Sequence, residues 1–410
     1  MEEIKGGITA PEGFKVSGVW CGIKKNKPDL ALIYSKVPAL ARAMFTTNKV
    51  KAAPVQICIE RIRQKRAQAI IVNSGNANSC TGKRGIRDAE RIIKTASQKL
   101  RVKEKEVLMA STGIIGKPLP VLKIEEGIKE AKEALSFSGS RQAAEAILTT
   151  DRATKEIALE TDISRRGKGK VKIGGMAKGS GMISPNLATM LCFITTDACI
   201  SEDALEEALR NSVNKSFNKI SVDGSMSTND SVFILANGLA RNRRIKTWRK
   251  KKKLRVDSED FHRFCEALDY TCISLAKMIV RDGVGATKSI EIKVEGAPFP
   301  RDAHRIARSI ANSNLVKTAV SGASPYWGRV MAAIGSAHTK LKIDRVDVYF
   351  DDIKVVGEGA TTGSDEEKLR EILKKDEIII RVQLNQGNCK TTFWGCDLSE
   401  KYVRINKRYL

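Results

Sequence analysis

Residues 174–197, GGMAKGSGMISPNLATMLCFITTD, join a glycine-rich run to an apolar stretch typical of a buried strand. Thr189 stands at the start of that strand, directly after Ala188. A threonine hydroxyl is a weak nucleophile unless a base lies beside it. Cleavage of the chain before Thr189 would supply that base as a new α-amine, whose pKa of about 8 suits proton transfer near neutral pH. The pattern is compatible with a self-cleaving threonine nucleophile, while the simpler interpretation, that Thr189 only begins a strand, stays open.

Other catalytic chemistries find little support in the sequence. The three histidines are His262, His304 and His338, and none lies inside a glycine-rich, serine-bearing or cysteine-bearing motif. The positions of the three histidines therefore argue against a Ser-His-Asp triad and against a zinc site built from histidine. Neither a phosphate-binding GxxxxGK[ST] loop nor a convincing GxGxxG after a strand occurs, so nucleotide chemistry is not indicated. We expect no metal and no cofactor.

The pattern of apolar residues and cysteines indicates a cytoplasmic protein. No run of about 18 apolar residues occurs, so no membrane span is predicted. The first residues, MEEIK, are acidic and lack the apolar segment of a secretory signal. Nine cysteines are scattered without a CxxC pair, which is typical of reduced intracellular thiols.

Apolar periodicity predicts three helices and a set of strands that alternate irregularly along the chain. The helices span residues 88–100, 201–217 and 258–281. The strands are rich in Val, Ile and Phe and span residues 29–34, 68–73, 190–195, 231–236, 289–294, 344–350 and 377–384. Without a strict βαβ period, we expect a layered α+β architecture rather than a doubly wound parallel sheet. The charged, glycine-rich segment 164–181 is expected to be an exposed loop.

Basic residues dominate the chain, and part of the excess is concentrated in one segment. The formal net charge is +25, and ten of the fifteen residues from Arg241 to Arg255 are Lys or Arg. One interpretation is a surface that binds nucleic acid or another anion. The alternative is a solvated surface loop, which we favour, so nucleic acid is not an expected partner.

Ten sequence blocks, in order along nearly the whole chain, closely resemble the ornithine acetyltransferase (bifunctional glutamate N-acetyltransferase) family. The first is the segment from Lys178 to Asp197, which resembles the self-processing segment of that family. The others are residues 72–82, 111–116, 216–218, 222–224, 227–230, 275–283, 327–329, 394–398 and 402–406. The resemblance implies an αββα-type sandwich with a smaller C-terminal α/β part.

The resemblance also implies an activity and a processing event. The precursor would cut itself between Ala188 and Thr189, giving an α chain of residues 1–188 and a β chain of residues 189–410, with a possible C-terminal subdomain at about 290–410. Thr189 would then take the acetyl group of N-acetylornithine and pass it to glutamate in a ping-pong exchange. Whether acetyl-CoA is a further donor stays open. Small amino acids are the implied substrates, and an α2β2 unit or a larger assembly is the implied oligomer.

Four further residues receive roles from the resemblance. Thr112 and Gly113 would form the oxyanion hole, in which a hydroxyl and a backbone N–H face the developing charge. Lys178 and Asn406, with Thr189, would bind the substrate. Without the family, Thr112 and Gly113 would be an ordinary turn after a strand at 106–110, Lys178 a solvated loop lysine, and Asn406 a residue that caps the local backbone.

Several positions depart from the family pattern, and they cluster at substrate contacts. Arg152 replaces a family threonine, Val284 replaces a glutamate, and the family's final Thr or Ser is missing after Leu410. Ser225-Met226, Ser324 and Tyr326 depart as well. Because an ammonium left without its carboxylate costs several kcal/mol when buried, on the order of 3–5, Val284 suggests a changed amine substrate. Two alternatives remain: a self-cleaving aminopeptidase or amidohydrolase, and a non-catalytic relative that binds anions through residues 241–255.

Overall fold

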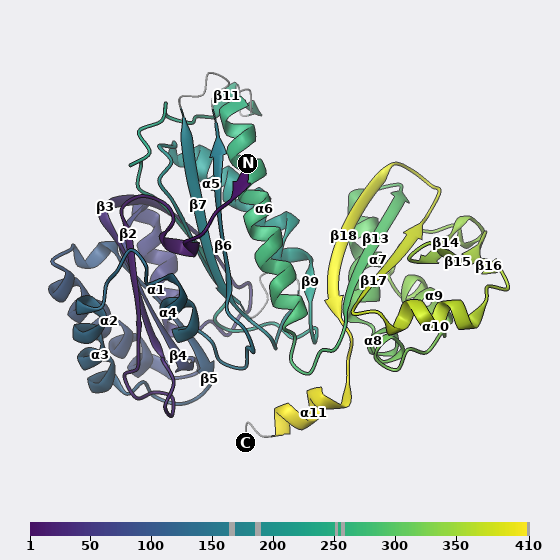
Figure 1. The fold of residues 1–410 in the computed structure, drawn as a ribbon, viewed down its shortest axis with the longest axis horizontal. Coiled ribbons are helices and arrows are strands. Elements are labelled where there is room, and N and C mark those ends of the chain that lie inside the picture. Colours follow the sequence, from purple (N-terminus) through teal and green to yellow (C-terminus); the bar gives the residue numbers. More distant parts are fainter. Residues whose placement is uncertain (164–168, 185–189, 251–252, 256–258, 408–410) are drawn as a thin grey trace. The chain divides into compact units, whose positions relative to one another are not determined.

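The computed structural model describes residues 1–163, 169–184, 190–250, 253–255 and 259–407, without the side chains of residues 248–250 and 253–255. These residues form two compact units (Figure 1). Unit 1 comprises Met1–Gly179, Asn186–Asn218 and Met226–Ala276. Unit 2 comprises Ser180–Pro185, Lys219–Ser225 and Lys277–Leu410. No helix of the described residues is long and apolar enough to cross a membrane.

Unit 1 is built around one long strand, β3 (Leu30–Phe45), which takes part in two sheet layers. Its first half pairs with β2 and β4, and its second half pairs with β10. Among the described residues nine strands form the sheet, in the order β1-β6-β7-β8-β10-β3-β4-β5 with β2 beside β3. The other strands are β1 (Glu2–Glu3), β2 (Phe14–Val19), β4 (Arg66–Asn76), β5 (Val107–Ile114), β6 (Lys155–Asp162), β7 (Lys170–Lys178), β8 (Leu191–Thr196) and β10 (Ser231–Ala236).

A continuous apolar core fills the space between the two layers. Ile33 and Val72 enter it from the β2–β5 layer, while Phe193 and Phe233 enter from the β6–β10 layer. The Phe193 and Phe233 rings stack with their centroids 5.7 Å apart. Burial of such large side chains on both layers is the main favourable contribution to folding of this unit.

Helices cover the outer face of each layer. α2 (Gly82–Leu100) and α3 (Val121–Glu133) pack on the alternate residues of β3, β4 and β5, including Leu32 and Ile71. On the other layer, α6 (Glu259–Arg281) lies so close to β7 that a Cβ on Gly175 would be 2.9 Å from Leu275. The layers therefore run helix, sheet, sheet, helix, which confirms the expected αββα sandwich. The remaining helices of the unit are α1 (Ala53–Arg61), α4 (Ser140–Ala146) and α5 (Glu202–Lys215).

The helices and strands that the sequence predicted have the expected type, but two segments were misassigned. The expected loop at 164–181 is wrong for residues 170–178, which form β7, a strand buried between β6 and β8. Its basic residues Lys170 and Lys172 point away from the buried positions Val171 and Ile173, so their charge hid an alternating strand pattern. The favoured surface loop at 241–255 is also incomplete, because β11 (Trp248–Lys250) and β12 (Lys253–Arg255) pair as an antiparallel hairpin.

Unit 2 is a second sheet with helices packed on it. Seven strands of the described residues run in the order β16-β15-β14-β17-β13-β18-β9. A separate core joins this sheet to its helices, with Ile292 and Phe393 on strands and Ile306 and Ile310 on α7. The strands are β9 (Ile220–Ser221), β13 (Ser289–Ala297), β14 (Asp347–Phe350), β15 (Ile353–Gly357), β16 (Ala360–Thr361), β17 (Glu377–Gln383) and β18 (Cys389–Cys396). The helices are α7 (Pro300–Asn312), α8 (Asn314–Ser321), α9 (Gly328–Gly335), α10 (Glu366–Lys374) and α11 (Glu400–Asn406).

Candidate active site

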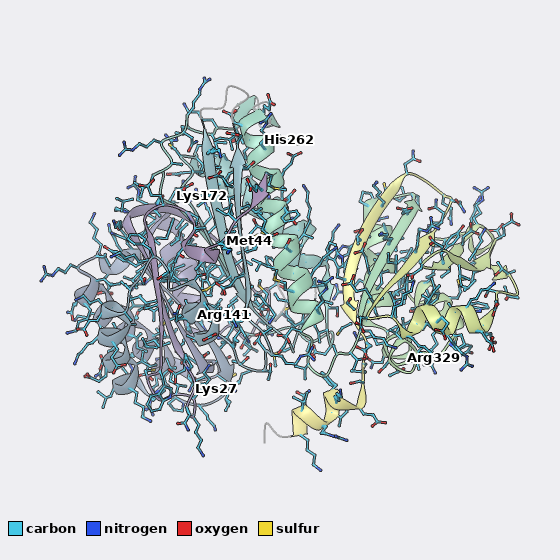
Figure 2. All side chains as sticks on the ribbon, in the orientation of Figure 1. Lys27, Met44, Arg141, Lys172, His262 and Arg329 are labelled. Carbon is cyan, nitrogen blue, oxygen red and sulfur yellow. The ribbon has the colours of Figure 1, made fainter. Side chains whose placement is uncertain are left out.

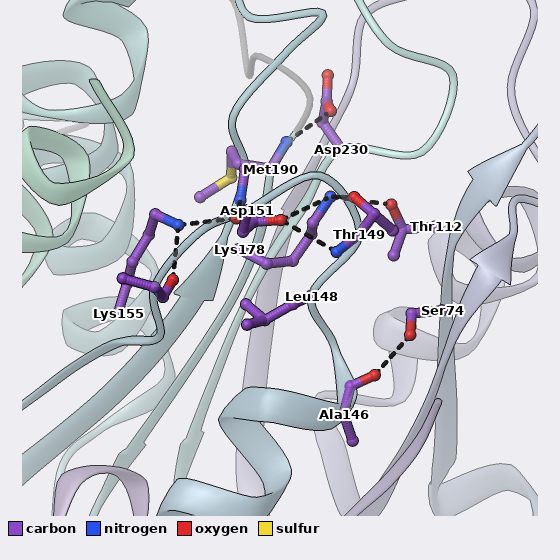
Figure 3. Close-up of polar contacts among 12 residues, drawn as sticks. Ser74, Thr112, Ala146, Leu148, Thr149, Asp151, Lys155, Lys178, Met190 and Asp230 are labelled. Carbon is purple, nitrogen blue, oxygen red and sulfur yellow. Dashed lines mark hydrogen bonds and ion pairs between the residues drawn. The ribbon is translucent and has the colours of Figure 1, made fainter. Parts of the chain in front are cut away.

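Lys178 is the last residue of β7, and its side chain is buried inside unit 1 (Figure 3). Its ammonium donates a hydrogen bond of 2.7 Å to the Thr149 hydroxyl and one of 3.3 Å to the Thr112 hydroxyl. The alternative interpretation of Lys178 as a solvated loop lysine is therefore wrong, and Lys178 contacts Thr112, one of the residues predicted for the oxyanion hole, directly. Two of the residues singled out in the sequence thus come together from segments 66 positions apart.

Asp151 is the carboxylate of this cluster, and its side chain is completely buried. One of its oxygens accepts hydrogen bonds of 2.7 Å from Lys155 Nζ and from the backbone N–H of Gly179. The other oxygen accepts the N–H of Thr149 at 3.1 Å and lies 3.7 Å from Lys178 Nζ. Burial opposes ionisation of the Asp151 carboxyl, but the charges of Lys178 and Lys155 and these hydrogen bonds outweigh it and hold its pKa below the ordinary value.

Two buried ammonium groups of the cluster share one carboxylate. Lys155 and Lys178 are 1% and 3% exposed, and both contact the single carboxylate of Asp151. Burial lowers the pKa of Lys178, while the charge of Asp151 and, more weakly, that of Asp230 favour its ammonium form. A buried ammonium that shares its carboxylate with a second ammonium is suited to bind an anionic group such as a substrate carboxylate.

Thr112 and Gly113 lie at the end of β5, where the strand is irregular. They pair with Ser74 and Gly75 of β4, and the register shifts directly afterwards at Asn76. The alternative interpretation of Thr112 and Gly113 as an ordinary turn is therefore wrong, because both residues belong to a distorted strand end. Gly113 has φ of +134°, and a Cβ there would lie 2.3 Å from the Gly75 carbonyl carbon and 2.4 Å from the Asn76 nitrogen. Only glycine fits this close approach of two backbones.

The predicted cleavage site, Ala188 and Thr189, lies outside the described residues. Met190, which follows it, is described and fully enclosed. Its backbone N–H donates a hydrogen bond of 3.0 Å to Asp230 Oδ1 (Figure 3). The next residue, Leu191, pairs with Lys178 across β8 and β7. Chain connectivity thus brings the predicted nucleophile within two residues of the strand position opposite Lys178.

The other predicted substrate residue, Asn406, belongs to unit 2. It is exposed on α11 and donates a hydrogen bond of 2.9 Å to the carbonyl of Tyr402, one helical turn earlier. Val284, the departure from the family glutamate, is also in unit 2 and is 8% exposed. Its N–H donates to the Ser180 carbonyl at 2.8 Å. Arg152 is exposed in unit 1, next to the buried Asp151.

Three residues of the cluster were missed in the sequence as functional candidates: Asp151, Lys155 and Asp230. Asp230 stood inside the recognised block 227–230 and Asp151 beside the departure at Arg152, but burial of their carboxylates could be known only from the fold. His262 of unit 1 is exposed on α6, 3.2 Å from Glu266 (Figure 2). Among the residues that the structure describes, no group of three or more His, Cys, Asp or Glu could hold a metal ion.

Comparison with known proteins gives a consistent picture. Residues 15–410 match the model of the ArgJ family. The chain is 46% identical to the arginine biosynthesis bifunctional protein ArgJ of Caldanaerobacter subterraneus subsp. tengcongensis, with all of both chains covered. It is 47% identical to the protein of the same name from Dehalococcoides mccartyi, covering 98% of this chain and 97% of the relative. A crystal structure of ArgJ from Bacillus halodurans aligns with a TM-score of 0.49 at 40% identity, over 52% of this chain and 97% of that one.

Proposed function

The chain belongs to the ArgJ family, and we propose that it transfers an acetyl group between amino-acid amines in arginine biosynthesis by way of acetylated Thr189. The donor is N-acetylornithine and the acceptor is glutamate. The observation that carries this proposal is the 3.3 Å hydrogen bond from Lys178 to Thr112. That contact joins a buried cation, suited to a substrate carboxylate, to a residue assigned to the oxyanion hole.

The first step creates the catalytic amine. The Thr189 hydroxyl oxygen attacks the carbonyl carbon of Ala188, and the peptide C–N bond breaks to leave an ester and a free Thr189 amine. One water molecule hydrolyses that ester, which restores the hydroxyl and releases the Ala188 carboxylate. Two chains result, and Thr189 now carries its own base.

The second step loads the acetyl group. The Thr189 oxygen attacks the acetyl carbon of the donor amide while the Thr189 amine takes the hydroxyl proton. Negative charge develops on the acetyl oxygen, where Thr112 and Gly113 would stabilise it. The donor nitrogen takes the proton from the Thr189 ammonium as its bond to the acetyl carbon breaks, and ornithine leaves. The acceptor amine of glutamate then attacks the acetyl ester by the reverse sequence of steps.

Buried charge in the cluster supports substrate positioning by Lys178. A carboxylate of the donor or acceptor would relieve the shared pairing of Lys178 with Asp151. Because Lys155 already holds Asp151 at 2.7 Å, the ammonium of Lys178 can turn toward a substrate without leaving Asp151 uncompensated. The acyl group would then be oriented against Thr189 by a contact made away from the reacting bond.

Three parts of the proposal rest on family membership: acetyl-CoA as an additional donor, assembly of the α and β chains into α2β2 or a larger unit, and a cytoplasmic location. Size-exclusion chromatography with light scattering measures the assembly. Isotope-labelled acetyl-CoA, incubated with glutamate, measures the additional donor activity.

Substitution of the nucleophile tests the proposal. Thr189→Ala should stay a single chain and transfer no acetyl group, whereas the wild type should show a new N-terminus at Thr189 on sequencing. Thr318→Ala, which removes an exposed helix hydroxyl of unit 2, is the matched control and should be cut and active. Cutting and turnover in Thr189→Ala would refute the assigned nucleophile. Release of free acetate in place of acetylglutamate would instead indicate an amidohydrolase.

A further inference from the structure

A buried aspartate fixes the turn that carries Lys24. Asp29 stands directly before β3, and its side chain is completely enclosed. Its two carboxyl oxygens accept the backbone N–H groups of Cys21 and Ile23, each at 2.7 Å, and that of Lys24 at 2.8 Å. The Asp29 carbonyl accepts the N–H of Ser74 in β4 at 2.8 Å. The backbone at Lys24 is therefore fixed relative to the end of β4.

The Lys24 side chain runs from this turn to the segment that follows α4. A Cβ on Gly75 would lie 2.9 Å from Lys24 Cγ, so the aliphatic stem packs directly on the backbone of Gly75. Gly75 pairs with Gly113, one of the residues predicted for the oxyanion hole. The Lys24 ammonium donates a hydrogen bond of 2.9 Å to the Leu148 carbonyl. Lys24 thus links the end of the β4–β5 pair to the chain between α4 and β6.

Leu148 begins the segment that carries polar groups of the cluster. The hydroxyl of the next residue, Thr149, accepts a hydrogen bond of 2.7 Å from the Lys178 ammonium, and its N–H donates to Asp151 at 3.1 Å (Figure 3). Because one planar peptide unit joins Leu148 to Thr149, a shift of the Leu148 carbonyl moves the Thr149 backbone with it. The position of the Thr149 hydroxyl, and the orientation of the Lys178 ammonium bonded to it, therefore depend on the contact with Lys24.

Electrostatic interactions also connect Lys24 to this cluster. Burial lowers the pKa of Lys24 to about 8, against the opposing charge of Asp29. The ammonium groups of Lys27 and Lys178 lower this pKa further, and the Asp151 carboxylate raises it. At pH 7 most Lys24 side chains are therefore ammonium groups, and a hydrogen bond from an ammonium to a carbonyl is stronger than one from a neutral amine.

We propose that Lys24 is a positioning residue for substrate binding: by holding the Leu148 carbonyl it fixes Thr149, and Thr149 in turn orients the Lys178 ammonium toward the substrate carboxylate. This inference rests on the proposed function, because it concerns the carboxylate site that the proposed function assigns to Lys178.

A purely structural role of Lys24 predicts a different result. The Leu148 carbonyl lies just beyond the C-terminal end of α4, where a cation also stabilises a helix. If Lys24 did only this, its removal would lower the stability of the protein and leave the affinity for substrate unchanged. A positioning role instead weakens substrate binding in the folded protein, because the Thr149 hydroxyl that orients Lys178 is no longer held in place.

Lys24→Met tests the proposal because methionine keeps an unbranched stem over Gly75 without the ammonium. We expect its KM for N-acetylornithine to rise by about 10-fold, as for the weakening of one charge-assisted hydrogen bond. Its kcat should stay within about threefold of the wild type, since a carboxylate contact made equally in the ground state and the transition state acts on KM alone. The Kd for ornithine, measured by calorimetry without a donor, should rise by a similar factor.

Two variants serve as controls. Lys24→Arg keeps a cation that can donate to the Leu148 carbonyl and should restore KM to within about threefold of the wild type. Lys25→Met removes an exposed ammonium from the next position of the turn and should leave KM, kcat and Kd unchanged. If Lys24→Met does not fold cooperatively, Lys24→Gln keeps a shorter, uncharged donor and carries the same expectations.

The four measured outcomes separate the interpretations. A folded Lys24→Met protein with raised KM and Kd, near-normal kcat and recovery in Lys24→Arg supports the proposal. Unchanged KM and Kd in a folded variant overturn it and leave Lys24 a helix-capping residue. The same rise in Lys25→Met also overturns it, because the effect would then come from net charge. A wild-type protein that binds no ornithine and transfers no acetyl group contradicts the proposed function instead.

Discussion

Asp151 Oδ1 accepts a hydrogen bond of 2.7 Å from Lys155 Nζ, and the two side chains are 0% and 2% exposed. Desolvating two such charges is costly, and their mutual attraction compensates only because the geometry is close. Lys178, 3.7 Å from the same carboxylate, depends on the pair for part of its own compensation. The Asp151 carboxylate therefore both stabilises the fold of unit 1 and compensates part of the charge that Lys178 presents to a substrate.

Asp151→Asn should destabilise the protein strongly, because it removes the carboxylate that the buried Lys155 and Lys178 share. The expected loss in the free energy of unfolding is about 3–5 kcal/mol. Urea denaturation in a Thr189→Ala background, where the chain is expected to stay uncut, measures it. Glu126→Gln, which breaks the exposed pair with Lys129, is the control and should cost under about 1 kcal/mol. A similar small loss for Asp151→Asn would contradict the electrostatic account.

A fall in pH should remove the contribution that the Asp151 carboxylate makes to the free energy of unfolding. The pKa of Asp151 is lowered in the folded state, so the carboxylate stabilises the fold above the unfolded pKa of about 3.9 and this stabilisation is lost as the pH falls below it. The urea midpoint of the protein that retains Asp151 should therefore decline more steeply from about pH 5 to pH 3 than that of the Asp151→Asn variant. Parallel declines of the two chains would count against this assignment.

Thr112→Ala should slow acetyl transfer without unfolding the protein. Loss of one oxyanion-hole donor typically lowers kcat by about 100- to 1,000-fold. Thr112→Ser keeps the hydroxyl that accepts from Lys178 and should retain most of the activity. Steady-state kinetics with N-acetylornithine and glutamate compare the two variants. Equal kcat values for Thr112→Ala and the wild type would remove Thr112 from the oxyanion hole.

Gly113→Ala should disrupt the end of β5. Its Cβ would collide with the backbone of Gly75 and Asn76, and its φ of +134° is strained for alanine. Gly116→Ala is the matched control, because Gly116 also has positive φ, +84°, but a Cβ there meets nothing within 4 Å. We expect a large drop in melting temperature or folded yield for Gly113→Ala and a much smaller one for Gly116→Ala. Similar melting temperatures would show that β4 and β5 separate easily.

Val284→Glu tests whether the departure at this position changes substrate preference. A carboxylate there should raise kcat/KM for donors with a free side-chain ammonium over donors without one, by about 10-fold or more. Val284→Gln has the same length without the charge and serves as the control. Competition between N-acetylornithine and an N-acetylated amino acid that lacks a side-chain amine measures the ratio. An unchanged ratio would show that Val284 does not set the choice of amine.

The sequence predicted several of the central strands and three of the helices because their apolar patterns are local. Strands at 29–34, 68–73 and 231–236 and the helix at 258–281 correspond to β3, β4, β10 and α6. β7 was missed because Lys170 and Lys172 on its outer positions dominated the pattern. Its other glycine, Gly174, is explained only by the fold, since a Cβ there would lie 2.2 Å from the Gly7 carbonyl oxygen.

The site was predictable only in part, for a related reason. Thr112 and Lys178 were identified through family resemblance, and the structure places them in contact. Nothing local marks Asp151 or Asp230 as buried, because each carboxylate is enclosed by segments distant in the sequence. Asp151 receives Lys178 from β7, and Asp230 receives Met190 from the start of β8. Such contacts become visible only when the strands are paired.

Intact-mass spectrometry of the purified wild-type chain, with and without N-acetylornithine, tests the central claim most directly. The account predicts two chains with masses of residues 1–188 and 189–410, and the addition of one acetyl group to the second chain alone when the donor is present. A single uncut chain of full mass that gains no acetyl group from N-acetylornithine would contradict it.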